Sequence, residues 1–258
     1  MQIGIFTDET ALATTAAKHL IKILNNSENK VLGLATGSTP LPLYEQLRAA
    51  NRAGKFTLRG VQGFALDEYV GIAADHPERY RNVLRAELVG DDKTGLREED
   101  LHTPEGNAAD PRQAAADYDA AIKAAGGIAI QILGIGADGH IGFNEPGTSL
   151  TSRTHVDVLT EQTRRDNARF FENDMDKVPS QCITQGLGTI MEAKYIMLIA
   201  TGENKATAVR ELVEGGISAR WQASMLQMHP NALILVDEAA ASELQLAAFY
   251  RERWNHNL

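Results

Sequence analysis

The most informative part of the sequence is Ile128-Ala-Ile-Gln-Ile-Leu-Gly-Ile-Gly-Ala-Asp-Gly-His-Ile-Gly-Phe-Asn-Glu-Pro146. Its first six residues are mostly apolar and rich in β-branched side chains, which predicts a buried strand. Four glycines and Pro146 follow, and they prevent a regular helix or strand from continuing. Asp138, His140 and Glu145 lie in the same loop. Because α/β sheets bind ligands at the carboxyl ends of buried strands, this loop is the first candidate for a functional site.

The segment Gly134-Ile-Gly-Ala-Asp-Gly139 matches the dinucleotide-binding pattern G-x-G-x-x-G. In that motif the last glycine begins a helix whose amino terminus holds a pyrophosphate. Here Gly142 and Pro146 follow too closely for such a helix to begin. Asp157 is near the position of a ribose-binding acid, but no strand clearly leads to it. We therefore expect no nicotinamide cofactor.

The sequence on both sides of this loop alternates between strand-like and helix-like segments. Asp8 and Asp110-Pro111 are suitable residues to begin two of the amphipathic helices. Apolar runs typical of buried strands lie at 2–6, 31–35, 61–66, 128–133, 195–200 and 232–236. The alternation predicts right-handed βαβ units and therefore a single doubly wound, mostly parallel sheet flanked by helices, a Rossmann-like α/β fold.

Less regular segments connect these elements. Residues 91–110 are rich in Asp, Gly and Pro, which predicts a long surface connection. Helices are expected near 203–215 and 219–228, and a last helix is expected from Asp237 or Glu238 onward.

A second candidate site lies at Thr36-Gly-Ser-Thr39, directly after the strand at 31–35. Pro40 then indicates the start of a helix. Unpaired backbone N–H groups, hydroxyl donors and the helix dipole all favour a bound anion at such a place. Taken alone, the segment could equally be an ordinary turn between a strand and a helix.

A third polar loop follows the strand at 61–66 and begins with Asp67-Glu68. A lone aspartate there would more often be a helix cap or a turn residue. However, the carboxyl ends of parallel strands meet at one edge of a sheet, so the loops at 36–39, 67–71 and 134–146 should lie together. This convergence favours a functional role for each loop.

Residues 147–180 are polar and partly irregular, and we expect them to form a mobile lid after the central loop. This segment contains Arg164, Arg165 and Arg169. Most arginines in such a segment are surface groups, but one that faces the site could bind a phosphate through two N–H groups. Lys205 lies in the first turn of a predicted helix, where it opposes the helix dipole. An anionic ligand is one candidate partner for it.

The composition limits the classes of function. Residues 1–258 show no composition break, and 43% of them are hydrophobic, so we expect one domain with a substantial core. No apolar run is long enough to span a bilayer and no signal-type N-terminus is present, which predicts a cytoplasmic protein without membrane partners. A net charge of −9 argues against nucleic-acid binding, although it permits a small phosphorylated ligand. Cys182 is the only cysteine, so no internal disulfide can form.

Four segments together carry a resemblance to a known family. They are Leu34-Ala-Thr-Gly-Ser-Thr-Pro40, Leu66-Asp-Glu-Tyr-Val-Gly71, Leu133-Gly-Ile-Gly-Ala-Asp-Gly-His-Ile-Gly-Phe-Asn-Glu-Pro146 and Ser152-Arg-Thr154. In order and spacing they resemble the glucosamine-6-phosphate deaminase family over nearly the whole chain. The resemblance implies conversion of glucosamine 6-phosphate and water to fructose 6-phosphate and ammonium. It implies an aldose–ketose isomerisation with loss of the amine, without a metal, a nucleotide or another cofactor.

The resemblance also implies roles for individual residues. By motif position, Asp67 resembles the base that takes the C2 proton, and His140 resembles the group that opens the pyranose ring. Asp138 and Glu145 resemble the acids that orient and tune this histidine. The substrate phosphate would be bound by Thr36, Gly37, Ser38, Thr39, Arg169 and Lys205.

Elementary chemistry agrees with these roles. Ring opening moves one proton off the anomeric hydroxyl and another onto the ring oxygen, which suits an imidazole near neutrality. Abstraction of a weakly acidic C–H proton requires a carboxylate shielded from water, so we expect Asp67 to act in a closed site. Asp138, His140 and Glu145 could formally bind a metal, but they lie in one glycine-rich loop without a second histidine nearby. A metal site is therefore the lesser alternative.

The sequence departs from part of the family pattern. Hexameric members carry basic residues just beyond the Ser-Arg-Thr segment, which bind the activator N-acetylglucosamine 6-phosphate between subunits. Here these positions are His155 and Asp157, and an aspartate would repel the activator's phosphate. We therefore expect no allosteric site, a doubtful hexamer, and a monomer or small homo-oligomer.

Three alternatives stay open. A 6-phosphogluconolactonase shares the Asp-Gly-His motif, but its family lacks the second carboxylate that Glu145 supplies here. A galactosamine 6-phosphate deaminase differs only in one hydroxyl contact that the sequence does not identify. A sugar-phosphate sensor of a transcriptional regulator would need a DNA-binding module, for which this acidic chain shows no helix-turn-helix.

Overall fold

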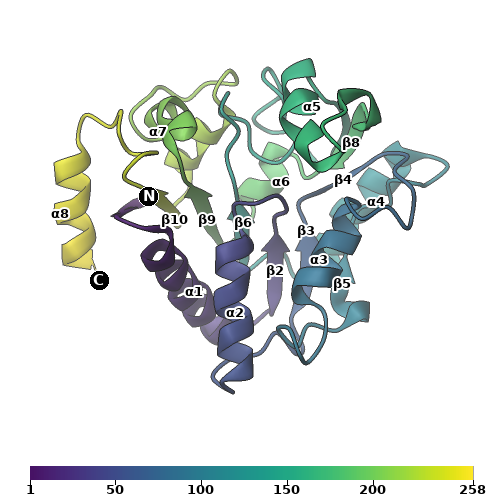
Figure 1. Ribbon diagram of the computed structural model, residues 1–258, viewed down its shortest axis with the longest axis horizontal. Coiled ribbons are helices and arrows are strands. Elements are labelled where there is room, and N and C mark those ends of the chain that lie inside the picture. The colour runs from purple at the N-terminus through teal and green to yellow at the C-terminus, as the bar shows by residue number, and fades with distance from the viewer. Residues whose placement is uncertain (258) are drawn as a thin grey trace.

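The computed structural model describes residues 1–257. Within them, seven parallel strands form one sheet in the order β1-β10-β9-β6-β2-β3-β5 (Figure 1). These strands are β1 (Gln2–Phe6), β2 (Val31–Leu34), β3 (Gln62–Ala65), β5 (Leu101–His102), β6 (Ile130–Leu133), β9 (Tyr195–Ala200) and β10 (Ala232–Asp237). Six of the seven were predicted. The short edge strand β5 was not, because it lies within the polar connection expected at 91–110.

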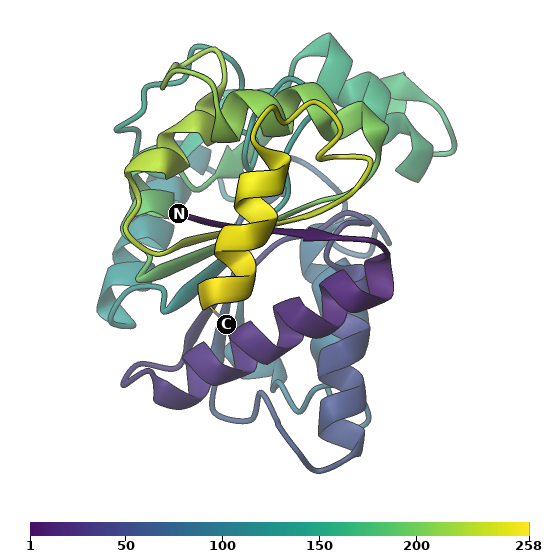
Figure 2. The same ribbon diagram turned by 90° about the vertical axis from the view of Figure 1, so that its left-hand side faces the viewer.

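Helices cover both faces of the sheet, as a doubly wound fold requires. One face is covered by α1 (Glu9–Asn26), α2 (Leu41–Arg52) and α3 (Tyr80–Leu88), whose leucines share a core with β2. The other face is covered by α4 (Pro111–Ala124), α6 (Leu187–Met191) and α7 (Ala206–Val213). Figure 2 shows α1 and α2 on one side of the sheet and α7 on the other. The predicted fold class is therefore confirmed.

Two predicted helix starts are confirmed by their hydrogen bonds. The Asp8 carboxylate accepts the backbone N–H of Ala11 at 2.8 Å, at the beginning of α1. The Asp110 carboxylate accepts the N–H groups of Arg112 and Gln113 at the beginning of α4. A cap of this kind depends only on residues two or three positions away, which makes it readable from sequence.

The sheet reverses its direction of winding between β2 and β6. From β2 the chain proceeds outward to β3 and β5, and it then returns to β6 and proceeds the other way to β9 and β10. The loops that follow β2 and β6 therefore diverge, and a crevice opens between them at the carboxyl edge of the sheet. In Figure 1 this edge faces the segment that carries α5.

A second sheet, which the sequence did not predict, lies above this edge. It is antiparallel and contains β4 (Asp67–Tyr69), β8 (Gln181–Thr184) and β7 (His155–Val158). We define the lid segment as residues 147–180. Besides β7, it contains α5 (Glu161–Asn167), η2 (Ala168–Phe170) and η3 (Met175–Lys177). These strands are short and pair across long sequence separations, so no local pattern indicates them.

The prediction of a last helix from Asp237 or Glu238 is wrong. The Asp237 carboxylate instead accepts the N–H groups of Ala240 and Gly202, which closes a turn. The last helix, α8, spans Ala247–Asn257 and packs beside β1. The helix expected at 219–228 is a 3₁₀ helix, η5, at Gln222–Met228. No helix within residues 1–257 is long and apolar enough to cross a membrane.

Candidate active site

A cavity of about 380 Å³ lies at the carboxyl ends of β2 and β6. Its walls come from the loop after β2, the loop after β6, β4, and the lid segment. Eight of the predicted site residues line it, namely Thr36, Gly37, Ser38, Thr39, Asp67, His140, Arg169 and Lys205. The tertiary structure thus brings together residues from segments that are far apart in the sequence.

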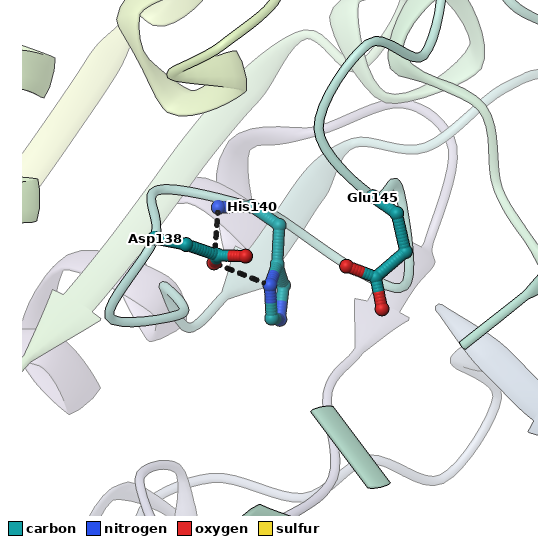
Figure 3. A group of neighbouring side chains, drawn as sticks. All are labelled: Asp138, His140 and Glu145. Carbon is teal, nitrogen blue, oxygen red and sulfur yellow. Dashed lines mark hydrogen bonds and ion pairs between the residues drawn. The ribbon is translucent and has the colours of Figure 1, made fainter. Parts of the chain in front are cut away.

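Asp138 and Glu145 do not line this cavity but flank His140 on either side (Figure 3). The Nδ1 atom of His140 lies 2.7 Å from Oδ1 of Asp138, and the same oxygen accepts the backbone N–H of His140 at 3.3 Å. Burial opposes ionisation of Asp138, but its hydrogen bonds and its interaction with the His140 imidazole lower its pKa to about 2. A carboxylate that is ionised at neutral pH therefore lies within ion-pair distance of the histidine ring.

Glu145 is 6% exposed and approaches His140 from the opposite side. Its Oε1 atom accepts the backbone N–H of Thr160 at 2.9 Å, while Oε2 is buried without a hydrogen-bond partner. An unpaired buried carboxylate oxygen beside an imidazole is suited to receive or direct a proton. Ligand atoms of Asp138, His140 and Glu145 lie within 4.8 Å of one another, a spacing that could hold a metal ion. The expectation of a metal-free reaction stays a prediction.

Asp67 opens β4 and faces the cavity, although its side chain is only 6% exposed. Burial, followed by the charge of the adjacent Glu68, raises its pKa to about 8. Within residues 1–257, no donor makes a hydrogen bond to this carboxylate that would favour its charged form. A carboxyl group with these properties can accept a proton from carbon once it is ionised.

Glu68, the next residue, has a structural role that the sequence did not reveal. Its fully buried carboxylate accepts the backbone N–H groups of Tyr69, Tyr80 and Arg81, each at 3.0 Å. Two of these groups belong to the first turn of α3, and the Arg79 guanidinium lies 3.8 Å away. Glu68 thus caps α3 from a separate strand and fixes the wall of the cavity beside Asp67.

The predicted anion site has the expected backbone form. Gly37 has a φ of +81°, which glycine adopts without strain, and the backbone oxygen of Ser38 accepts the N–H of Leu41 as α2 begins. Arg169 of η2 and Lys205 of the 3₁₀ helix η4 (Glu203–Lys205) line the same cavity. Burial lowers the pKa of Lys205, and the Arg169 charge adds to this, while Asp166 and Asp138 oppose it. Two cations and a helix amino terminus therefore converge on one place.

Several residues of the site were missed from the sequence. Tyr80 and Asn167 line the cavity, and the Tyr80 ring stacks at 6.0 Å on Phe143 of the central loop. Outside the cavity, the Arg220 guanidinium donates to the backbone oxygen of Asp138 at 3.1 Å and lies over the Trp221 ring. The aromatic residues in the 69–80 region were the only hint in the sequence that this region contributes to the site. The residues that they contact come from distant segments, so the hint could not be interpreted.

The fold and the site together define a class of protein. It is a doubly wound α/β protein whose crevice combines a glycine- and hydroxyl-rich loop before a helix with a buried carboxyl group and a histidine beside a carboxylate, a set suited to acid–base chemistry on a phosphorylated small molecule. The chain belongs to the family of glucosamine-6-phosphate isomerases and 6-phosphogluconolactonases, whose sequence model matches residues 7–235.

Relatives of known name are similar over nearly the whole chain. A protein named glucosamine-6-phosphate deaminase from Mycolicibacterium smegmatis is 51% identical over 254 residues, which cover 98% of this chain and 97% of the relative. One of the same name from Streptomyces coelicolor is 49% identical over 256 residues, covering 99% of this chain and 97% of the relative.

Solved structures agree with the fold. A monomeric glucosamine-6-phosphate deaminase superposes with a TM-score of 0.90 at 38% identity, and the match covers 94% of this chain and 99% of that one. A 6-phosphogluconolactonase from Trypanosoma cruzi superposes with a TM-score of 0.76 at 21% identity, covering 95% of this chain and 97% of that one. At this lower identity the likeness shows the fold alone.

Proposed function

We propose that this protein is a glucosamine-6-phosphate deaminase, which converts glucosamine 6-phosphate and water to fructose 6-phosphate and ammonium. Relatives with this name are about half identical over nearly their full length. One geometric observation carries the proposal: two acid–base groups, Asp67 and His140, line one cavity with the loop at 36–39. A sugar phosphate bound through that loop can present its reacting carbons to both groups.

The first step would open the pyranose ring. His140 takes the proton of the anomeric hydroxyl and returns a proton to the ring oxygen, so that the C1–O5 bond breaks and an aldehyde forms. Asp138 supports the charge that the imidazole carries between these transfers, because its carboxylate lies 2.7 Å from Nδ1. Glu145, with an unpaired oxygen on the other side, can direct the second ring nitrogen.

The second step would convert the aldehyde at C1 into an imine at C2. Ionised Asp67 takes the C2 proton, and the electron pair of the broken C–H bond forms a C1–C2 double bond. The π electrons of the C1 aldehyde move to its oxygen, which takes up a proton, and the product is an enolamine. Protonation at C1 then gives an imine at C2. Addition of water to C2 and departure of ammonia, which leaves as ammonium, give the ketone of fructose 6-phosphate. In the substrate-free site the high pKa keeps most of Asp67 protonated at pH 7. The ammonium group at C2 of the substrate would favour its ionised form.

The phosphate would be held at the opposite end of the cavity. Thr36 to Thr39 offer hydroxyl and backbone donors, and Lys205 and Arg169 supply two positive charges. Arg169 belongs to the lid segment, so we propose that the segment closes over the bound sugar and shields Asp67 from water. The lid and the rest of the chain would act as one domain over residues 1–258.

We also propose that the activator site of the hexameric members is missing and that the protein is a monomer or a small homo-oligomer. The Nε2 atom of His155 lies 3.4 Å from Oδ2 of Asp157, so these two residues pair within β7. A carboxylate, in place of a basic side chain, would then face the activator's phosphate, which disfavours its binding. A solved relative that is described as monomeric supports this view. A phosphorylated substrate, which membranes retain, supports a cytoplasmic location.

The test is the release of ammonium and fructose 6-phosphate from glucosamine 6-phosphate. It is run with a chelator, and with and without N-acetylglucosamine 6-phosphate. We expect equal amounts of ammonium and fructose 6-phosphate. We expect neither the chelator nor N-acetylglucosamine 6-phosphate to change the rate of their release. Turnover of 6-phosphogluconolactone or galactosamine 6-phosphate in place of glucosamine 6-phosphate would contradict the proposal.

A further inference from the structure

The peptide group between Asp138 and Gly139 is hydrogen bonded at both of its ends. Its N–H, which belongs to Gly139, donates to the backbone oxygen of Gly136 at 3.0 Å. Its oxygen, which belongs to Asp138, accepts from the Arg220 guanidinium at 3.1 Å. The first bond lies within the central loop, whereas the second comes from a residue 82 positions further along the chain.

The local backbone offers little else to fix this peptide group. Gly139 has a φ of +87°, and glycine adopts positive and negative φ with similar ease because it lacks a β-carbon. Rotation of the peptide group changes ψ of Asp138 and φ of Gly139. These angles help to set how the side chains of Asp138 and His140 lie relative to each other. The two hydrogen bonds therefore supply the restraint that a glycine-rich turn lacks.

The residues after Arg220 contact the same turn. A β-carbon at Gly139 would lie 2.5 Å from Cε3 of Trp221, so the indole ring packs directly on this glycine. The backbone N–H of Ala223 donates to the oxygen of Gly139 at 3.0 Å. The Arg220 guanidinium carbon lies 4.8 Å from the centroid of the Trp221 ring, which favours one position of this side chain. The guanidinium is thus held by the ring while it donates to the turn.

Arg220 reaches the turn from the side away from the 36–39 loop. Together with Trp221, Asp138 and His140, it lines a second cavity of about 260 Å³. Of these four residues, His140 alone also lines the main cavity within residues 1–257. Arg220 can therefore act on the turn without contacting a sugar bound in the main cavity.

We propose that Arg220 is a positioning residue that keeps the Asp138 carboxylate beside the His140 imidazole by holding the Asp138 backbone oxygen. The two side chains lie 2.7 Å apart, with the carboxylate also on the backbone N–H of His140 (Figure 3). A misplacement of about 1 Å can cost on the order of a hundredfold in rate, so a modest loosening of the turn should be measurable. The effect on rate rests on the proposed function, in which this pair opens the sugar ring.

The first experiment is a double-mutant cycle on kcat with glucosamine 6-phosphate. Arg220→Met keeps an apolar stem on the Trp221 ring and removes the hydrogen-bond donor. It should lower kcat about three- to tenfold with little change in KM, the range expected for one hydrogen bond. In an Asp138→Asn background the same substitution should have no further effect, because Arg220 acts through Asp138. A general structural defect would lower kcat by the same factor in both backgrounds.

Two single variants accompany the cycle. Arg220→Lys keeps a positively charged donor and should recover part of the kcat that Arg220→Met loses. Arg59→Met is the matched control, since it removes an exposed arginine that pairs with Asp91 away from both cavities. It should leave kcat and KM unchanged.

The second experiment requires no turnover. It measures hydrogen–deuterium exchange of the Gly139 amide in the substrate-free protein, residue by residue by NMR. Arg220→Met should speed this exchange about three- to tenfold, because the peptide group loses one of its two restraints. The amides of β6 should be unaffected, and so should the Gly139 amide in Arg59→Met.

Two outcomes would overturn the inference. One is an equal loss of kcat from Arg220→Met in the parent and in the Asp138→Asn background, and the other is unchanged exchange of the Gly139 amide. The exchange also separates this inference from the proposed function. Faster exchange in a protein whose parent releases no ammonium would contradict only the proposed function, and ammonium release with unchanged exchange would contradict only the role of Arg220.

Discussion

Asp67 and Glu68 are neighbours in the chain, yet their carboxylates have opposite environments. Glu68 accepts three backbone N–H groups and caps α3. Asp67 accepts none within residues 1–257 and faces the cavity. Because successive side chains of a strand point to opposite sides, one acid serves the fold and the other faces the cavity. The charge of Glu68 also helps to keep the pKa of Asp67 high.

The ionisation of Asp67 predicts the pH dependence of the reaction. A base must be deprotonated to act, so kcat/KM should rise as the pH approaches the Asp67 pKa of about 8 and level off above it. Asp67→Asn should abolish turnover while phosphate binding is retained. Initial rates from pH 6 to 9 and phosphate titrations of the variant provide the measurements. Full activity in the Asp67→Asn protein would remove Asp67 from the role of base.

The same buried carboxyl group predicts a stabilising effect of Asp67→Asn. Its pKa is raised from 3.8 to about 8, so the native state binds more protons than the unfolded state between these values, and stability falls as the pH rises. At pH 8 the variant should be more stable than the parent by roughly 2–5 kcal/mol, and at pH 4 the difference should vanish. Urea denaturation at both pH values measures it. Equal stabilities at pH 8 would show that Asp67 is not buried in a charged form.

Glu68→Gln should affect both stability and activity. The amide NH₂ would face a backbone N–H at the start of α3, which costs about 2–3 kcal/mol of folding free energy. Loss of the neighbouring charge should lower the pKa of Asp67 and shift the rise of kcat/KM to lower pH. Thermal unfolding and the pH–rate profile test the two parts. An unchanged profile in a folded variant would argue that the two carboxyl groups do not interact.

Arg169→Ala should weaken recognition of the phosphate. The side chain lines the cavity and lies over the Phe170 ring, with its guanidinium 4.6 Å from the ring centroid. Loss of a charge-assisted contact of about 1.5–3 kcal/mol should raise KM for glucosamine 6-phosphate on the order of ten- to a hundredfold. Arg165→Ala, which removes an exposed arginine of the preceding helix α5 that pairs with Glu161, is the control. Equal KM values for both variants would exclude Arg169 from the phosphate site.

Much of this molecule could be predicted because the relevant interactions are local. The caps of α1 and α4 depend on Asp8 and Asp110 and on residues at most three positions away. Parallel strands place the loops after β2 and β6 at one edge by geometry alone. The convergence of the loops that carry Thr36 and His140 on one edge of the sheet was therefore predicted, and the structure places both residues in the wall of one cavity.

Other features depend on partners that no sequence window contains. The sheet of β4, β8 and β7 joins residues 67–69, 155–158 and 181–184, and the strands are too short to show a pattern. Asp237 is of a residue type that often begins a helix. Its carboxylate instead accepts the backbone N–H of Gly202 from another loop. Tertiary hydrogen bonds of this kind override local propensity, since a buried polar group must find its partner wherever the fold places it.

By itself, the sequence determined the α/β alternation, the principal strands, two helix starts and the set of groups available for catalysis, because side-chain type and near-neighbour spacing decide these. Only the tertiary structure decided which groups are buried and what they face. It separates Asp67 from Glu68, places Asp138 and Glu145 on opposite sides of His140, and joins Tyr80 to Asn167 through Tyr69. Burial and long-range contacts set the pKa of each ionisable side chain and the way in which it points. Neither burial nor these contacts exist until distant segments of the chain pack together.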